Sequence, residues 1–383
     1  MTSKGNGNHS ILTSYIMLVA LVAAGVTIFA LLYKGQGAVA LNNASAAFNE
    51  AVQAERGMDI ETTPAPTPTP VPVSLTGRII PYYDTGLWGY KNTLGQIVIQ
   101  PAFTEAFEFE NGVAFAKKDG VYGLLSINDV WLVEPAWTNV LPFSDDYAAV
   151  EKDGKWGYID KSGKVVIEYQ FREAGSFHCG RAAVRSGSAF GYIDIFGNMA
   201  VNARWRKAGD FSEDLAFATS DEYEKDRHYI IDKVGEKVAT LGSTLEGTVF
   251  SEGFAVVVER GATYYYLNSV GQSAYTQTFR DARAFCDGLA AVRNESGWGF
   301  INTLGSFEIP AQYAQALDFC DGYAAVQDNV SGKWGYIDAK GVEKIPFLYD
   351  SAAPFSEGFA IASIGSEFYL LNKDGESKLF YTK

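Results

Sequence analysis

Length, composition and charge exclude several classes of protein before any motif is considered. The chain has 383 residues, of which 14% are aromatic, and a formal net charge of −14. The aromatic content favours β-structure, and the acidic balance argues against a nucleic-acid binder, which needs a basic surface. Three cysteines and three histidines supply neither a disulfide framework nor a paired-cysteine metal motif. We therefore expect no nucleic-acid partner, no metal and no cofactor.

The first elements are a short polar N-terminus, residues 1–10, and an uncharged apolar stretch over residues 11–33. About 20 apolar residues cross a bilayer core, so this stretch predicts a single transmembrane helix. A cleavable signal peptide is the alternative, because Ala38-Val39-Ala40 has the small-residue form of a cleavage site. The apolar region of such peptides is roughly 7–15 residues, so the length favours an uncleaved anchor.

Two segments of low complexity follow. Residues 34–60 are rich in alanine and predict a short helix with no assigned function. Residues 61–73 alternate proline with threonine or small apolar residues, which gives an extended spacer without a core. Such stalks are typical of exported segments, although an ordinary interdomain linker would leave the side of the membrane open. We expect a single-pass membrane protein with residues 74–383 outside the cell.

Residues 74–383 repeat one pattern about eight times, with a truncated ninth copy. The clearest copy is Trp156-Gly157-Tyr158-Ile159-Asp160, followed by Gly163. Successive copies start 34 to 38 residues apart, and a Phe–x–acidic–Gly–x–Ala block recurs later in each unit. The residues equivalent to Trp156 are Trp88, Tyr122, Phe190, His228, Tyr264, Trp298, Trp334 and Phe368. Repetition of this kind indicates an array of stacked units.

The segments 155–160 and 333–338, both reading Lys-Trp-Gly-Tyr-Ile-Asp, carry a resemblance to a known family. The pattern resembles the bacterial WG-repeat family, also called KWG repeats, over about residues 78–383. The resemblance implies a β-rich repeat protein, often at a bacterial membrane or surface. It supplies no catalytic residues to transfer.

Each unit predicts three short strands joined by turns in which an Asp or Asn precedes a glycine by three residues. The bare Gly157 lets a neighbouring backbone or ring approach closely, and Phe171 is a candidate for that space. One unit cannot bury its own face, so neighbours must stack. We expect an all-β array, an open β-solenoid or superhelix of three-stranded units of about 34 residues. A closed β-propeller is the alternative, but its four-stranded blades normally need roughly 40–45 residues.

The recurring polar residues are expected to build the fold. Neither a glycosidase nor a calcium site needs a carboxylate in every repeat, whereas Asx residues and glycines commonly form turns. The carboxylates at fixed register are Asp160, Asp194, Asp338, Asp287, Asp321 and Glu357. We expect His178 and His228 to pack in degenerate copies. Cys286 and Cys320 share one register position, which favours half-buried small side chains over a disulfide.

Contacts with a partner are expected at positions that do not repeat. These positions are the charged insertion at 220–227, the pair Tyr265-Tyr266 and the loop 328–331. The candidate partner-binding residues are Asp221, Glu222, Tyr223, Arg227, Tyr265, Tyr266, Asp328 and Asn329. The tryptophans at the start of the repeats are expected to pack between units, because residues fixed in every unit usually serve stacking.

We therefore expect a membrane-anchored, exported, non-catalytic protein-binding or scaffolding module at the cell surface. Its partner would be a protein or a polymer of the cell envelope. One alternative is a cell-wall glycan-binding or sensory ectodomain, which would present a row of exposed rings. Another is a carboxylate-dependent hydrolase, which would need two carboxylates about 5–10 Å apart in one cleft.

Overall fold

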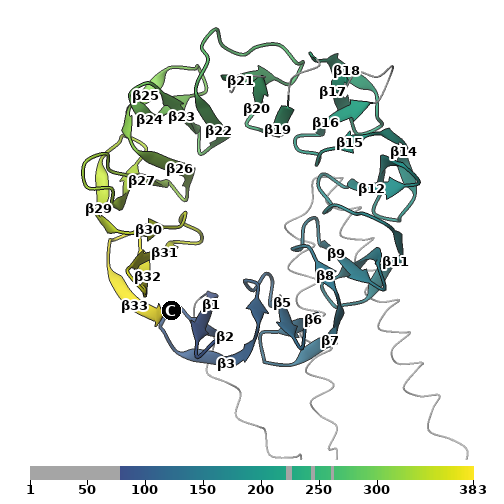
Figure 1. Cartoon of the computed structure of the whole chain (residues 1–383), viewed down its shortest axis with the longest axis horizontal. Coiled ribbons are helices and arrows are strands. Elements are labelled where there is room, and N and C mark those ends of the chain that lie inside the picture. Colours follow the sequence, from purple (N-terminus) through teal and green to yellow (C-terminus); the bar gives the residue numbers. More distant parts are fainter. Residues whose placement is uncertain (1–77, 221–226, 243–245, 260–262) are drawn as a thin grey trace, which may run out of the picture. The chain divides into compact units, whose positions relative to one another are not determined.

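The computed structural model describes residues 78–220, 227–242, 246–259 and 263–383. The secondary structure of these residues consists of strands, grouped in nine antiparallel sheets that stand around a ring (Figure 1). Within each sheet the chain runs outward as a meander, with the first strand nearest the centre and the last at the rim. We refer to the sheets as blades 1 to 9 in chain order.

The blades have the following strands. Blade 1 comprises β1 (Ile79–Asp84), β2 (Leu87–Asn92) and β3 (Ile97–Phe103); blade 2 comprises β4 (Glu105–Ala106), β5 (Val113–Lys118), β6 (Val121–Ser126) and β7 (Trp131–Trp137); blade 3 comprises β8 (Asn139–Val140), β9 (Tyr147–Lys152), β10 (Lys155–Asp160) and β11 (Val165–Phe171). Blade 4 comprises β12 (Ala182–Ser186), β13 (Ala189–Ile193) and β14 (Met199–Trp205); blade 5 comprises β15 (Lys207–Ala208), β16 (Leu215–Ser220), β17 (Arg227–Asp232) and β18 (Lys237–Thr240); blade 6 comprises β19 (Glu246–Ser251), β20 (Phe254–Glu259) and β21 (Thr263–Asn268). Blade 7 comprises β22 (Asp281–Cys286), β23 (Leu289–Asn294), β24 (Gly297–Asn302) and β25 (Phe307–Tyr313); blade 8 comprises β26 (Gln315–Cys320), β27 (Tyr323–Gln327), β28 (Trp334–Asp338) and β29 (Glu343–Tyr349); blade 9 comprises β30 (Ser351–Ala352), β31 (Phe359–Ile364), β32 (Glu367–Asn372) and β33 (Ser377–Thr382).

The array is closed, so the expectation of an open solenoid of three-stranded units is wrong. Blade 1 packs directly on blade 9, where Ile80 and Tyr82 share a buried cluster with Leu370 and Phe380. The Lys91 ammonium group also donates a hydrogen bond to the Phe380 carbonyl oxygen at 2.8 Å. These contacts join the first and last sheets of the ring, which is a β-propeller.

Short turns explain why repeat length misled the prediction. The inner strands β4, β8, β15 and β30 have only two residues each, but β22 and β26 have six and their blades still span only residues 281–313 and 315–349. A four-stranded blade with tight turns therefore fits within about 34 residues, less than the roughly 40–45 residues usual for a propeller blade. Each sequence repeat also begins within a blade, at the third strand in blades 2, 3 and 5 to 9 and at the second strand in blades 1 and 4, so one unit links two neighbouring blades.

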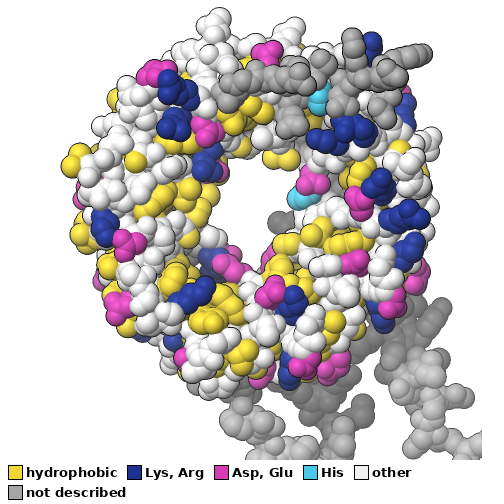
Figure 2. Space-filling view, in the orientation of Figure 1, with side chains coloured by type: hydrophobic (Ala, Val, Ile, Leu, Met, Phe, Trp, Pro, Cys, Tyr) yellow, Lys and Arg dark blue, Asp and Glu magenta, His cyan; other side chains and the backbone are white. Residues whose placement is uncertain are grey.

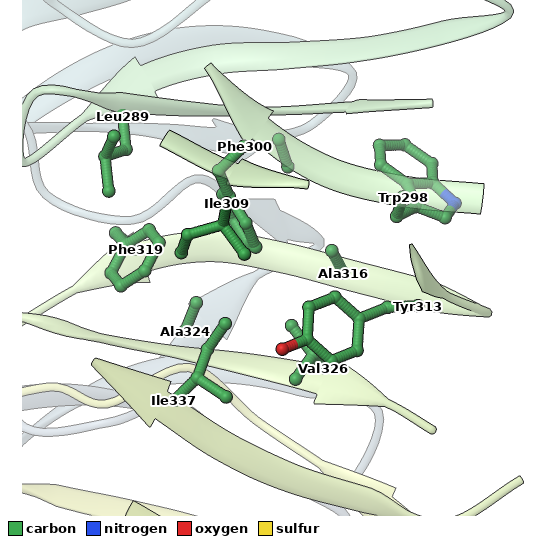
Figure 3. Close-up of a cluster of buried hydrophobic side chains, with 11 residues drawn as sticks. Leu289, Trp298, Phe300, Ile309, Tyr313, Ala316, Phe319, Ala324, Val326 and Ile337 are labelled. Atoms are coloured by element: carbon green, nitrogen blue, oxygen red, sulfur yellow. The ribbon is translucent and has the colours of Figure 1, made fainter. Parts of the chain in front are cut away.

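The hydrophobic core lies between neighbouring blades. Figure 3 shows the interface of blades 7 and 8, where side chains from both sheets interlock. Blade 7 contributes Leu289, Trp298, Phe300, Ile309 and Tyr313, and blade 8 contributes Ala316, Phe319, Ala324, Val326 and Ile337. Burying one large apolar side chain contributes roughly 1.5–3 kcal/mol, so each blade depends on its neighbours for stability.

The predicted segments 1–10, 11–33, 34–60 and 61–73 lie outside the described residues. Within the part of the chain that is described, no helix has the length and apolar character needed to cross a bilayer.

Candidate interaction surface

The glycine of the repeat motif is required by the close approach of the outer strand. At Gly157 an added Cβ atom would lie 2.7 Å from the carbonyl oxygen of Ile167 in β11. The same contact measures 2.5 to 2.7 Å at Gly89, Gly123, Gly191, Gly299 and Gly335. The predicted close approach is confirmed, but the space is filled by backbone: Phe171 instead pairs with Trp156 in the β10–β11 register.

The tryptophans are packing residues. All seven lie in the described part of the chain and are buried or half-buried; Trp298, for example, is 3% exposed. The molecule therefore does not present the row of exposed tryptophans that stacking on a glycan would need.

The first set of carboxylates forms turns, as predicted. Asp160 accepts hydrogen bonds from the backbone N–H groups of Ser162 and Lys164 at 2.9 and 3.1 Å. Asp338 makes the equivalent bonds to Lys340 and Val342, and the Val342 amide holds the pKa of this carboxyl below its usual value. We call these the Asx turns; each directly follows the strand in which a sequence repeat begins.

The second set of carboxylates connects blades, a role that sequence reasoning missed. Asp287 has φ 54° in its turn, and its carboxylate accepts the backbone N–H of Gly322 in the next blade at 2.9 Å. Equivalent bonds join Asp145 to Gly180, Glu213 to Gly253, Glu252 to Gly288 and Asp321 to Gly358. The signal in the sequence is the acidic–Gly pair at one register in successive repeats.

Buried tyrosines add a second link between blades. The Tyr158 hydroxyl donates to the carbonyl oxygen of Gly175, 17 residues later, at 2.9 Å. Tyr90, Tyr192, Tyr266 and Tyr336 repeat this bond at 2.7 to 2.8 Å, and burial raises the pKa of each hydroxyl. Tyr266, a predicted partner-binding residue, is 1% exposed and is therefore a core residue.

The other predicted partner-binding residues do not form one site. Asp221, Glu222 and Tyr223 lie outside the described residues. Arg227 is exposed at the start of β17 in blade 5, and Tyr265 is half-buried in β21 of blade 6. Asp328 and Asn329 lie in the hairpin of blade 8.

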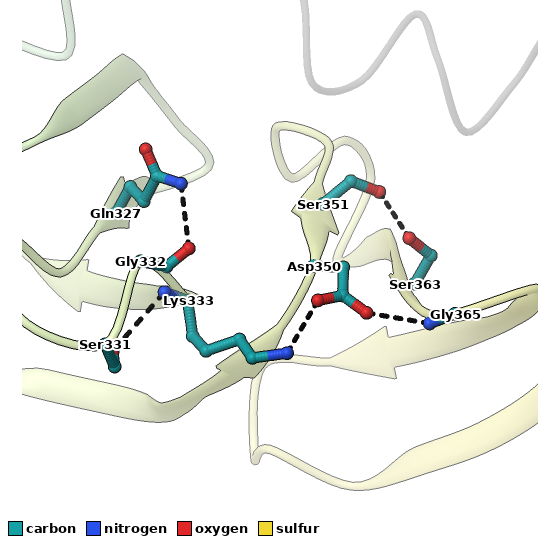
Figure 4. Close-up of polar contacts among 8 residues, drawn as sticks. All are labelled: Gln327, Ser331, Gly332, Lys333, Asp350, Ser351, Ser363 and Gly365. Atoms are coloured by element: carbon teal, nitrogen blue, oxygen red, sulfur yellow. Dashed lines mark hydrogen bonds and ion pairs between the residues drawn. The ribbon is translucent and has the colours of Figure 1, made fainter.

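That hairpin is fixed by local polar contacts. Asp328 accepts the backbone N–H of Ser331 at 2.7 Å, which lowers the pKa of its carboxyl, and the Asn329 amide donates to the carbonyl oxygen of Gln312. Figure 4 shows the adjoining network, in which Lys333 of blade 8 reaches Asp350 at 2.6 Å. These residues therefore brace the loop and the junction with blade 9.

The junction where the ring closes holds two pockets, of about 450 and 410 Å³. Both are lined by Arg78 and Glu108, which form an ion pair. Arg78 also donates to the Ser356 carbonyl oxygen at 2.7 Å and lies 3.9 Å from the Glu357 carboxylate. Because its charged groups pair with one another, we assign this junction to ring closure.

Figure 2 views the ring along its axis and shows hydrophobic and acidic side chains around the central opening. His178 lies 3.2 Å from the Ser144 hydroxyl and 3.8 Å from the Asp210 carboxylate. Among the described residues no group of three or more His, Cys, Asp or Glu side chains could hold a metal ion.

A repeated feature of the Asx turns stands out as a surface for interaction. In blades 4 to 7 the second residue after the Asx is large, apolar and exposed, and we call these four residues the apolar arc. They are Phe196, Val234, Val270 and Leu304, exposed by 78, 65, 56 and 82%. The N–H of each donates to the Asx side chain at 3.0 to 3.2 Å, which fixes the backbone of each turn tip.

Carboxylates share the face of the apolar arc with a few basic groups, since Arg181 and Arg204 donate to the carbonyl oxygens of Lys233 and Gly235 in the Asx turn of blade 5. In an antiparallel meander the first and third turns lie on the same face, so the acidic–Gly turns lie on the face of the Asx turns. In blades 5 to 7 they contribute Glu213, Asp214, Glu252 and Asp287. Lys233, in the Asx turn of blade 5, is paired with Asp214 at 3.0 Å.

Fold and turns together define a closed β-propeller built from sequence repeats. The WG containing repeat family matches six segments, 88–122, 122–156, 156–188, 190–222, 298–333 and 334–367, which cover more than half of the chain. The chain belongs to this family.

The comparison with solved structures finds matches at low sequence identity. A eukaryotic initiation factor aligns with a TM-score of 0.60 and 11% identity, over 80% of this chain and 96% of that chain. BamB from Moraxella catarrhalis aligns with a TM-score of 0.40 and 14% identity, over 71% of this chain and 91% of that chain. Hsv2p from Kluyveromyces lactis aligns with a TM-score of 0.37 and 11% identity, over 65% of this chain and 98% of that chain. Of these three, the initiation factor is similar enough to support the closed propeller, and at such identity the likeness shows the fold alone. The comparison with curated proteins yields no match.

Proposed function

We propose that this chain is a non-catalytic binding module, anchored in a membrane by residues 11–33, whose ring lies outside the cell and binds a protein through the apolar arc. The observation that carries the proposal is the arc itself. Four consecutive blades place an exposed apolar side chain at one turn position, where blades 3, 8 and 9 have Ser162, Lys340 and Asp374. Grouped exposed apolar residues commonly mark interaction sites.

The charge of this face supports a partner of defined chemistry. Carboxylates flank the arc, and electrostatic complementarity guides association between proteins. A polypeptide that combines apolar side chains with lysines or arginines would cover the turn tips and meet these carboxylates. An acidic partner would be repelled.

A defined peptide tests this proposal with the full-length chain. The probe is a labelled peptide of alternating leucine and lysine, compared with its leucine–glutamate counterpart by fluorescence anisotropy. Phe196→Ser combined with Leu304→Ser should weaken binding of the first peptide at least tenfold, because burying each side chain contributes roughly 1.5–3 kcal/mol. The matched control is Leu94→Ser, which alters the same turn position in blade 1, outside the arc, and should change binding less than twofold.

Equal binding by wild type and the double variant would contradict the proposed surface, and so would tight binding of the leucine–glutamate peptide. Location is tested separately by protease treatment of intact cells. Release of ring fragments is expected, and their complete protection would refute an external ring.

A second candidate, a glycan-binding or sensory ectodomain, is favoured by a different observation. Blade 6 contains a pocket rich in hydroxyl groups on its outer side. This pocket does not involve the apolar arc.

A further inference from the structure

Blade 6 departs from the other blades at its rim. In each of the others an outer strand follows the strand in which the sequence repeat begins, whereas in blade 6 the chain after β21 makes only two isolated bridges, Leu267 with Ser273 and Tyr264 with Phe279. A pocket of about 390 Å³ opens between this segment and the sheet. The polar residues that line it include Glu259, Thr263, Tyr265, Ser273, Thr276 and Thr278.

The strand register places three of these groups in a row. Glu259 in β20 lies directly opposite Thr263 in β21, and Tyr265 is two residues further along the same strand, so all three share one face of the sheet. Tyr265 also packs on a buried cluster that includes Phe250 and Val257. The pocket therefore offers a carboxylate, a hydroxyl and an aromatic ring held in place.

The opposite wall is also fixed. Tyr264 and Phe279 exchange two backbone hydrogen bonds at 2.8 and 2.9 Å, and the Ala274 N–H donates to the Tyr266 carbonyl oxygen at 2.8 Å. The Tyr275 hydroxyl donates to the carbonyl oxygen of Thr303, in the Asx turn of blade 7, at 2.7 Å. A ligand would therefore enter a preformed site, which reduces the ordering cost of binding.

The chemistry of the lining selects the ligand. The described lining residues supply a carboxylate, hydroxyl groups and an aromatic ring but no basic group, so these groups favour a neutral or cationic ligand over a phosphate or a carboxylate. A purely apolar ligand would leave the hydroxyl groups without partners. A sugar satisfies both conditions, because its hydroxyls can pair with threonines and a carboxylate while its C–H face packs on an aromatic ring.

We propose that this pocket binds a neutral or amino-bearing sugar unit of a glycan. The site goes beyond the protein-binding role proposed above and shares no residue with the apolar arc. Failure of one proposal therefore leaves the other standing.

Calorimetric titration of the full-length chain tests the site with four trisaccharides. These are the N-acetylglucosamine trimer, the glucosamine trimer, maltotriose and trigalacturonate. Binding of at least one of the first three is expected, with trigalacturonate at least tenfold weaker. Tyr265→Ala should weaken binding at least tenfold, and Tyr83→Ala, at a half-buried tyrosine of blade 1, should leave it unchanged.

Thr276→Val provides a variant that keeps the fold, because Thr276 is exposed and the change removes only a hydroxyl group. Binding should weaken several-fold, while Phe196→Ser with Leu304→Ser should bind the sugars as wild type does. The proposal is overturned if no trisaccharide binds at millimolar concentration, if the acidic sugar is preferred, or if Tyr265→Ala and Thr276→Val both bind as wild type.

Discussion

Replacing Gly299 by alanine tests the reason for the glycine in the repeat motif. The added Cβ atom would lie 2.6 Å from both the Ile309 carbonyl oxygen and the Ala311 nitrogen. An ordinary contact begins near 3.4 Å, so the outer strand would have to move by about 0.8 Å. Both atoms belong to backbone that is held by the pairing of Phe300 with Ile309, so no side chain can rotate to relieve the overlap.

The magnitude follows from two opposing terms. Overpacking of a fixed interior destabilises the fold by roughly 1–3 kcal/mol. A Gly→Ala change also lowers the conformational entropy of the unfolded chain, which stabilises the fold by roughly 0.4–1 kcal/mol. We expect a net loss of about 2 kcal/mol, measured by urea unfolding followed by tryptophan fluorescence. Gly175→Ala is the matched control, because its Cβ atom would meet nothing closer than 3.4 Å, and it should be neutral or slightly stabilising.

A Gly299→Ala variant as stable as wild type would contradict the steric requirement for glycine. Equal destabilisation by both substitutions would contradict it too, because the loss would then reflect glycine flexibility and not the approach of the outer strand.

Three further predictions concern the links between blades and the half-buried thiol of Cys286. Tyr158→Phe leaves the Gly175 carbonyl oxygen without its 2.9 Å bond and should cost about 1–2 kcal/mol in urea unfolding; unchanged stability would show that water replaces the hydroxyl. Asp321→Ala removes the acceptor of the Gly358 N–H, so hydrogen exchange at that amide should accelerate, and unaltered exchange would contradict a stabilising bond. Burial raises the pKa of the Cys286 thiol to about 11. Because the thiolate is the reactive form, the rate of its alkylation by iodoacetamide, followed by mass spectrometry, should rise about tenfold per pH unit from pH 8 to 10. A plateau in this rate near pH 9 would refute the raised pKa.

Much of the fold could be predicted from the sequence because the repeat fixes local structure. The Asp160 turn, the close approach at Gly157 and the burial of Trp298 follow from residue types at fixed spacing. The closure of the ring could not be predicted, because the two-residue inner strand β4 has no hydrophobic periodicity of its own. A short strand is defined by its pairing partners and leaves little pattern in the sequence.

The candidate sites were only partly predictable for a related reason. Tyr265 and Tyr266 are adjacent in sequence and equally aromatic, yet β21 turns one towards the pocket of blade 6 and buries the other in the core. Which residue faces outward depends on the side of the sheet that packs on the next blade. The exposure of the turn tips Phe196 and Leu304 similarly follows from the position of the Asx turns at the edge of the ring.

The division between repeated and altered positions suggests where binding specificity lies. Carboxylates such as Asp287 and Asp321 recur because each bonds the backbone of the next blade, so much of the acidic charge reflects how the ring is built. The family pattern leaves residues 223–297 unmatched. That stretch contains Val234, Val270 and all the residues that line the pocket of blade 6. Positions that stack every unit cannot distinguish one partner from another, so we expect recognition to use positions that vary between blades. The turn tips of the apolar arc, from Phe196 to Leu304, and the pocket of blade 6 both meet that condition.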